Sequence, residues 1–157
     1  HHPGLARIVQ ACQDIPGQHL FQYYDGEGRR HAISSTDVNA YLYEITEQDF
    51  TAKDFRTWAG TVLFVDALRR LDPCKSSHEA KQRIVALIRE VAAQLRNTPT
   101  VCRKYYIHPV ALSAYLDRSI YERLERMCGS NAHIRRTPTR SLVMRLLKQA
   151  ARYQTAR

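Results

Sequence analysis

Residues 49–61 read DFTAKDFRTWAGT, and they open a long apolar stripe. Thr51 can cap a helix because its side-chain oxygen can accept a free amide hydrogen of the first turn. Large apolar residues then recur at three- and four-residue steps until Asp72-Pro73 interrupts the pattern. The spacing predicts a helix over residues 51–71. Its core-facing stripe would consist of Phe55, Trp58, Val62, Val65 and Leu68.

The residues before this helix predict two further helices separated by a hairpin. They would be a helix over 5–12 that ends before Pro16-Gly17, strands at 20–24 and 31–33 around a turn at 25–28, and a helix that ends near Thr46. Ser34 to Asp37 supplies the cap of this second helix.

The residues after the helix over 51–71 predict more helices and no strand. The clearest is an amphipathic helix over 78–96, whose apolar face consists of Ile84, Ile88, Val91 and Leu95. A short helical segment from Pro99 to about Tyr105 and a helix over 109–116 would follow. The last expected elements are a basic helix over 118–127, a linker over 129–138 and a helix around Leu142–Leu147. The fold class is therefore mainly α, with one small β-hairpin near the N-terminus.

The charge pattern favours a polyanionic partner. The 157 residues carry 24 Lys and Arg against 15 Asp and Glu, and residues 101–157 alone hold 12 of the basic and 3 of the acidic side chains. Nucleic acid is the first candidate and a membrane surface the second, while a solvated helical surface rich in arginine is the plainer reading. No apolar run approaches the roughly 20 residues of a membrane span, so a cytoplasmic protein is expected.

The four cysteines predict neither a disulfide framework nor a metal site. Cys12, Cys74, Cys102 and Cys128 lie far apart and show no C-x-x-C spacing. We expect reduced packing residues, and the sequence indicates no metal and no cofactor.

Three segments carry residues suited to chemistry on a phosphodiester: Lys53 to Thr57, Asn97 to Pro99 and Arg103 to Pro109. A tyrosine hydroxyl can attack phosphorus and hold a covalent phosphoryl intermediate. Arg56 could stabilise the charge on the non-bridging oxygens, with Asn97 as a neutral donor. Each residue also has an ordinary interpretation: a surface arginine, a helix C-cap at Asn97 and a buried aromatic cluster over 105–107.

The order of these segments resembles the catalytic domain of type IB DNA topoisomerases, in the bacterial, poxvirus-like branch. The resemblance covers residues 5 to about 116. Its two most specific stretches are residues 49–60, DFTAKDFRTWAG, and residues 97–109, NTPTVCRKYYIHP.

The resemblance implies a role for each matching residue. Tyr106, in Tyr-Ile-His-Pro, would be the nucleophile that forms a 3′-phosphotyrosyl bond, and Arg56 would bind the non-bridging oxygens. Asn97 stands where poxvirus enzymes and recombinases have histidine, and the bacterial branch is similar to this chain in having asparagine. Lys53, Arg103 and Lys104 would contact DNA. The implied protein is a monomer that relaxes supercoiled double-stranded DNA at the nucleoid without ATP or a metal.

Two departures from the family pattern carry expectations of their own. The family's other arginine and its lysine general acid have no counterpart here. Residues 1–116 are therefore interpreted as the C-terminal part of the catalytic domain, and the chain alone is expected to be inactive. Residues 117–157 are interpreted as a divergent basic helical tail. Tyr105 stands where the family usually has a small residue.

Two other functions remain open. A tyrosine recombinase or integrase usually has His-x-x-Arg where this chain has Lys53-Asp54-Phe55-Arg56, and Leu-Gly-His where it has Leu95-Arg96-Asn97. A non-catalytic basic helical module would bind only the DNA backbone, with strongly salt-dependent affinity.

Overall fold

The structure is a computed structural model that describes residues 2–129 and 131–155. The chain divides into two compact units, the first ending at Ala52 and the second beginning at Lys53. The described part of residues 117–157 belongs to the second unit together with residues 53–116.

The first unit contains two helices and the hairpin. Its elements are α1 (Pro3–Gln13), β1 (Gln22–Tyr24), β2 (Arg30–Ala32) and α2 (Ser35–Thr46). The strands pair antiparallel, with Gln22 opposite Ala32. Ser34 and Asp37 form a reciprocal capping box, in which each side chain accepts a hydrogen bond from the other residue's backbone N–H. The predicted helices and hairpin are confirmed. β1 begins two residues later than predicted, and β2 lies one residue earlier than predicted.

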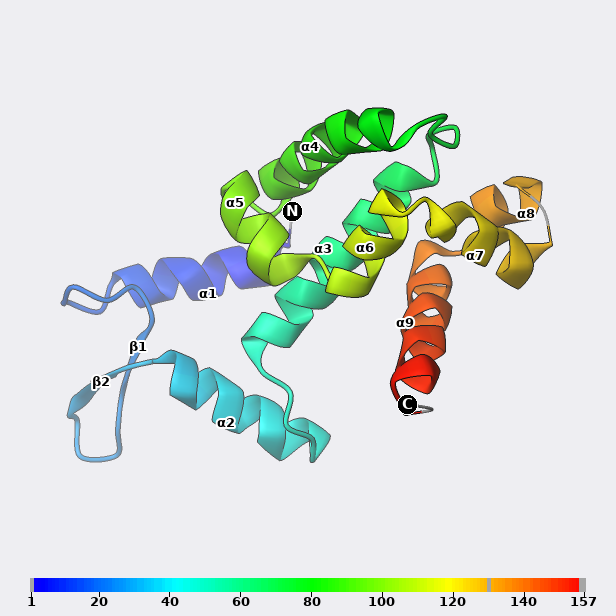
Figure 1. Ribbon diagram of the computed structural model, residues 1–157. Coiled ribbons are helices and arrows are strands. Elements are labelled where there is room, and N and C mark those ends of the chain that lie inside the picture. Colours follow the sequence, from blue (N-terminus) through cyan, green and yellow to red (C-terminus); the bar gives the residue numbers. More distant parts are fainter. Residues whose placement is uncertain (1, 130, 156–157) are drawn as a thin grey trace. The chain divides into compact units, whose positions relative to one another are not determined.

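Within its described residues the second unit contains helices joined by turns and loops, and no strand (Figure 1). After α3 (Ala52–Leu68), whose first residue ends the first unit, come α4 (Ser77–Gln94), α5 (Pro99–Val101), the π-helix η1 (Cys102–Tyr106), α6 (Pro109–Leu116), α7 (Ser119–Cys128), α8 (Asn131–Arg136) and α9 (Thr139–Thr155). The mainly α prediction with a single hairpin is confirmed for the described residues.

The linker predicted over residues 129–138 is wrong in its middle, because residues 131–136 form α8. Gly129 does end a helix: it caps α7 with a φ of 83°, which glycine adopts without steric cost. Ser130 lies outside the described residues.

The core of the second unit collects apolar faces from α3, α4, α6, α7 and α9. Figure 1 shows these helices gathered around α3 and α6. The rings of Phe64 on α3 and Tyr115 on α6 meet edge to face with their centroids 6.0 Å apart. The predicted inner face of α4 is confirmed, with Ile84, Ile88 and Val91 almost fully buried and Leu95 packed against the core.

The predicted inner face of α3 is wrong at its N-terminal end. Phe55 is 52% exposed, whereas Phe64, which lies off the predicted stripe, is completely buried. Trp58 and Val62 are partly buried, and Val65 and Leu68 are fully buried. The neighbouring helices therefore cover the C-terminal half of α3 and leave its first turns accessible.

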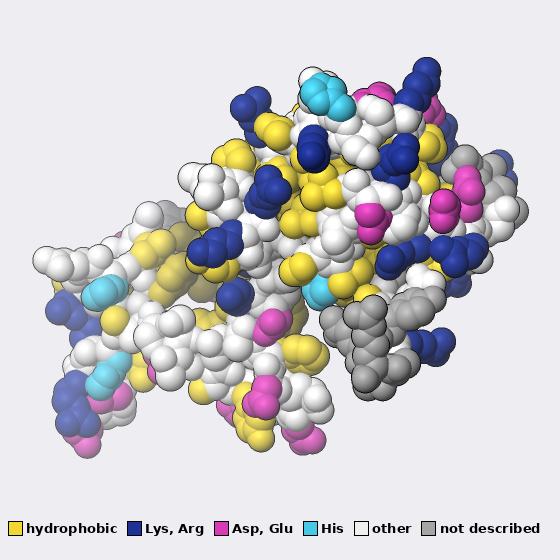
Figure 2. Space-filling view, viewed as in Figure 1, with side chains coloured by type: hydrophobic (Ala, Val, Ile, Leu, Met, Phe, Trp, Pro, Cys, Tyr) yellow, Lys and Arg dark blue, Asp and Glu magenta, His cyan; other side chains and the backbone are white. Residues whose placement is uncertain are grey.

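The surface of the second unit mixes charges of both signs. On the face seen in Figure 2, Lys and Arg side chains are spread over the surface rather than gathered in one patch, and acidic side chains lie among them. Local pairs of basic groups are therefore more informative about a binding site than the net charge is.

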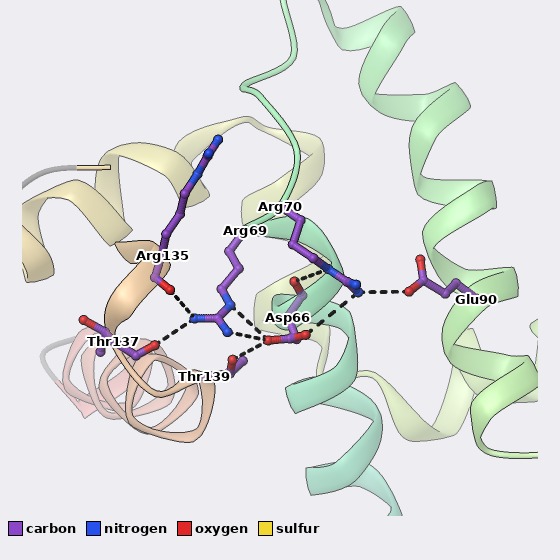
Figure 3. A network of polar contacts seen from close by, with 7 residues as sticks. All are labelled: Asp66, Arg69, Arg70, Glu90, Arg135, Thr137 and Thr139. Carbon is purple, nitrogen blue, oxygen red and sulfur yellow. Dashed lines mark hydrogen bonds and ion pairs between the residues drawn. The ribbon is translucent and has the colours of Figure 1, made fainter. Parts of the chain in front are cut away.

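A polar network joins the end of α3 to the start of α9 (Figure 3). Arg69 donates to the Asp66 carboxylate at 2.9 Å and to the backbone carbonyls of Arg135 and Thr137 at 3.1 and 2.8 Å. The Thr139 hydroxyl donates to the same carboxylate at 2.6 Å. This bond is the main cause that lowers the pKa of Asp66. The network therefore fastens the C-terminal helices to the core of the second unit.

Replacing Arg69 with Met is expected to lower the free energy of unfolding by about 1–2 kcal/mol, because two carbonyls lose their guanidinium donor and the Asp66 carboxylate keeps only the Thr139 hydroxyl and the more distant Arg70. Urea denaturation monitored by circular dichroism measures the effect. The loss should shrink as the pH falls through the lowered pKa of Asp66, since a protonated Asp66 no longer depends on a cation.

Arg70→Met is the matched control. Arg70 also contacts Asp66, at 3.8 Å, and Glu90, but its side chain is 58% exposed, whereas that of Arg69 is 21% exposed. We expect a loss below about 0.5 kcal/mol for this exposed pair. Equal losses in the two variants would contradict a fastening role for Arg69.

Candidate active site

The residues singled out in the sequence lie on three segments of the second unit. Lys53 and Arg56 are in the first turns of α3, Asn97 is in the loop between α4 and α5, and Arg103 to Tyr106 form most of η1. Arg56, Lys53, Arg103 and Lys104 are exposed, while Asn97 and Tyr106 are half-buried.

Arg56 and Tyr106 are brought together by the fold. The guanidinium carbon of Arg56 lies 4.8 Å from the centroid of the Tyr106 ring. Arg56 also donates to the carbonyl of Leu95 at 2.9 Å, so its side chain is held between η1 and the end of α4. The remaining guanidinium N–H groups stay next to the tyrosine and remain positively charged at any working pH.

Asn97 lies beside this pair along the chain, two residues after Leu95. Its backbone N–H donates to the carbonyl of Ala92 at 2.9 Å, and its side-chain oxygen accepts from the N–H of Thr98 at 2.8 Å. The left-handed residue that ends α4 is Arg96, with a φ of 51°, not Asn97. The C-cap interpretation therefore misplaced the left-handed residue by one.

The nucleophile candidate lies at the end of an unusual helical turn. The segment predicted as one short helix changes from α5 into the π-helix η1, in which the N–H of Ile107 bonds to the carbonyl of Cys102 at 3.1 Å. Single π-helical turns occur often at functional sites. Cys102 is fully buried, and this burial raises the pKa of its thiol, so it is a packing residue rather than a reactive one.

One face of α3 holds η1 in register. The Thr57 hydroxyl lies 3.0 Å from the carbonyl oxygen of Tyr105 and 3.0 Å from that of Lys53, and the Thr61 hydroxyl accepts from the N–H of His108 at 2.9 Å. Between these two threonines the carbonyl of Tyr106 packs directly on Gly60, where a Cβ would overlap its oxygen and lie 2.9 Å from its carbon. The backbone of η1 can approach α3 this closely only because residue 60 has no side chain.

Thr57, Gly60 and Thr61 had no predicted role, although all three lie within residues 49–61. Their spacing is a usable signal, because positions 57, 60 and 61 share one face of a helix with each other and lie next to Arg56. Two hydroxyls and a glycine on one helical face indicate a close backbone approach from another segment.

His108 caps α6 as a neutral imidazole. Its Nδ1 accepts the N–H of Val110 at 3.2 Å, and burial lowers the pKa of the ring. A protonated ring would lose this acceptor. Because the folded pKa lies below the unfolded one, the contribution of His108 to stability is complete above the ordinary histidine pKa and is lost as the pH falls through the lowered value.

We therefore expect His108→Asn to remove part of the loss of stability on acidification, because an asparagine side chain caps a helix without titrating. Thermal unfolding compared between pH 7 and pH 5 measures this. The variant should lose less stability than the unchanged chain over this interval, and an identical loss in the two proteins would contradict the assignment.

Comparison with known proteins identifies a family that this chain matches. Residues 4–128 match the family model described as eukaryotic DNA topoisomerase I, catalytic core. The chain belongs to this family. A relative named DNA topoisomerase 1B, from Acanthamoeba polyphaga mimivirus, is 30% identical over 115 residues, which cover 68% of this chain and 34% of the relative. The match thus spans about a third of the length of that viral topoisomerase.

The topoisomerase match includes every candidate site residue, from Lys53 to Tyr106. Within the described residues no helix has the length and apolar character needed to cross a membrane, and no group of three or more His, Cys, Asp or Glu is arranged to hold a metal ion. The four cysteines are free: Cys74 and Cys102 are buried, and Cys12 and Cys128 are partly buried.

Proposed function

We propose that this topoisomerase chain carries the nucleophile and part of the phosphate-binding group of a type IB DNA topoisomerase. The observation that supports this most is the guanidinium of Arg56 held 4.8 Å from the ring of Tyr106, from a position 50 residues earlier in the sequence. A fixed positive charge held beside the ring of a half-buried tyrosine suits attack of its hydroxyl on a phosphodiester.

In the proposed reaction the Tyr106 hydroxyl oxygen attacks a backbone phosphorus of double-stranded DNA. The phosphorus–O5′ bond breaks, and the 3′ side stays on the tyrosine as a phosphodiester. The Tyr106 hydroxyl loses its proton and the leaving 5′ oxygen gains one, so no proton is gained or lost overall. The released strand rotates to relax supercoils, and the reverse attack restores the duplex. One phosphodiester replaces another in each step, so the reaction needs no ATP and no metal to balance it.

The other residues stabilise the charge that develops on the phosphate. Arg56 binds the non-bridging oxygens through paired N–H donors, and Asn97 adds a neutral amide donor from the loop before α5. Lys53, Arg103 and Lys104 contact neighbouring backbone phosphates, which position the DNA without reading its sequence.

The finer assignment to the bacterial, poxvirus-like branch rests on Asn97 and on the stretches around Arg56 and Tyr106. We propose a monomeric enzyme that acts at the nucleoid. The resemblance identifies no counterpart of the family's remaining arginine or of its lysine general acid in residues 1–157. Residues 1–157 by themselves are therefore expected not to relax DNA, because removing a positioned acid costs about 10² to 10⁴ in rate.

Trapping the covalent intermediate tests the proposal. The protein that contains this chain is incubated with a nicked duplex whose cleaved 5′ strand diffuses away, and the adduct is digested and mapped by mass spectrometry. We expect a nucleotide on Tyr106 in the presence of EDTA and without ATP.

Three results would contradict the proposal. Binding without any adduct would indicate the non-catalytic basic module. Site-dependent strand exchange by a tetramer would indicate a recombinase. An adduct on Tyr105 would show that Tyr105, and not Tyr106, is the nucleophile.

A further inference from the structure

The ring of Tyr105, the residue before the proposed nucleophile, lies close to two lysine ammonium groups. The Nζ of Lys53, from α3, lies 5.3 Å from the centroid of the Tyr105 ring, and the Nζ of Lys104, its neighbour on η1, lies 5.1 Å from the same centroid. Both distances fall within the range in which an ammonium group is attracted by the negative face of an aromatic ring. Lys53 and Lys104 are both exposed, and the Tyr105 ring is 43% exposed, so the two ammonium groups can meet a ligand from solvent.

The backbone beneath the ring is anchored. The Thr57 hydroxyl lies 3.0 Å from the carbonyl oxygens of both Lys53 and Tyr105, so one side chain ties the two segments that supply the lysine from α3 and the ring. The next residue, Tyr106, is fixed against Gly60 and under Arg56. The position of the ring relative to the nucleophile is therefore set by the same face of α3.

Two lysines on one small surface would ordinarily spread apart. Like charges repel, and a lysine side chain that has no partner samples many rotamers in water. A ring that attracts both ammonium groups offsets part of the repulsion between them and reduces the number of rotamers that the two lysine side chains sample. A small residue at position 105 would leave the same two charges without a common partner.

We propose that Tyr105 is a positioning residue: it holds the ammonium groups of Lys53 and Lys104 so that they receive the DNA phosphates next to the one that Tyr106 attacks. The inference rests on the proposed function for the location of the scissile phosphate. Tyr105 takes no part in the covalent step, and its hydroxyl is dispensable because the attraction comes from the ring.

The test is DNA affinity as a function of salt. It is measured by fluorescence anisotropy on a labelled duplex with the protein that contains this chain, in a Tyr106→Phe background that forms no covalent bond. Tyr105→Leu is expected to weaken binding about three- to tenfold at low salt and to flatten the dependence of log K on log[KCl] by about one. Tyr105→Phe keeps the ring and is expected to restore both values.

A double-mutant cycle separates this role from a packing role. In a protein that carries both Lys53→Met and Lys104→Met, the change Tyr105→Leu is expected to have no further effect on affinity, because its partners are gone. An equal loss in both backgrounds, or a loss of affinity with an unchanged salt slope, would overturn the proposal.

The adduct assay keeps the two proposals apart. If Tyr105→Leu leaves affinity and salt slope unchanged while Tyr106 still forms the covalent adduct, the inference about Tyr105 fails alone. If the adduct forms on no residue of this chain, the proposed function fails, whatever the binding measurements give.

Discussion

Replacing Tyr106 with Phe is expected to abolish relaxation of supercoiled plasmid and the covalent DNA adduct together, with a loss on the order of 10⁴-fold or more. The change removes one oxygen atom, the only atom of the side chain that can attack phosphorus. The ring remains, so the contact with the Arg56 guanidinium and the packing of η1 on α3 are retained. Affinity for a duplex should therefore change by less than about threefold, since the phosphate contacts carry most of it.

This combination of a lost reaction and retained binding is what identifies a nucleophile. A Tyr106→Phe protein that still forms the adduct would exclude position 106. A protein that loses binding and reaction together, with a lower unfolding temperature, would instead indicate that the hydroxyl holds the fold. Tyr105→Phe is the matched control, because it removes the same atom from the neighbouring position and is expected to retain adduct formation.

Gly60→Ala is expected to lower relaxation on the order of 10²-fold, because a displacement of about 1 Å at a reacting group costs that much. A Cβ on Gly60 would overlap the carbonyl oxygen of Tyr106 and lie 3.1 Å from its Cβ. Neither contact can be relieved by rotating a side chain, because the carbonyl oxygen belongs to the backbone and a Cβ does not move when its side chain rotates. The end of η1 must move away from α3 and take the tyrosine ring with it.

The same change is expected to cost about 1–3 kcal/mol in the free energy of unfolding, as for other overpacked sites. Gly26→Ala is the matched control, because a Cβ there would meet no atom within 4 Å. It should leave both activity and stability close to their starting values. Unchanged activity in Gly60→Ala would show that the contact between α3 and η1 does not position Tyr106.

Most helices of this chain could be predicted because helical signals are local. The capping box at Ser34 and Asp37 and the stripe of Ile84, Ile88 and Val91 each lie within a few turns, and the structure confirms them. The predictions were wrong where contacts between distant segments determine which side chains are buried. Phe55 and Phe64 are equally apolar, and only the helices that pack on α3 determine that Phe64 is buried and Phe55 is not.

The candidate site shows the same division between local signals and tertiary contacts. The residue types and their order in Lys53 to Thr57 and in Arg103 to Pro109 carried the resemblance to type IB topoisomerases, and the family match agrees with it. The roles of Thr57, Gly60 and Thr61 could not be predicted, because they depend on the packing of another segment, η1, against α3. The π-helical turn at η1 also had no local signal.

The sequence by itself determined a mainly helical chain with an early hairpin, an excess of positive charge toward its end, and the residues that could act on a phosphodiester. These properties depend on neighbours within a few turns or on composition. The tertiary structure alone decided that Arg56 lies against Tyr106, that Tyr105 collects two lysines, and that residues after 116 pack into the second unit. Contacts between residues tens of positions apart arise from the packing of whole helices, which no short pattern encodes.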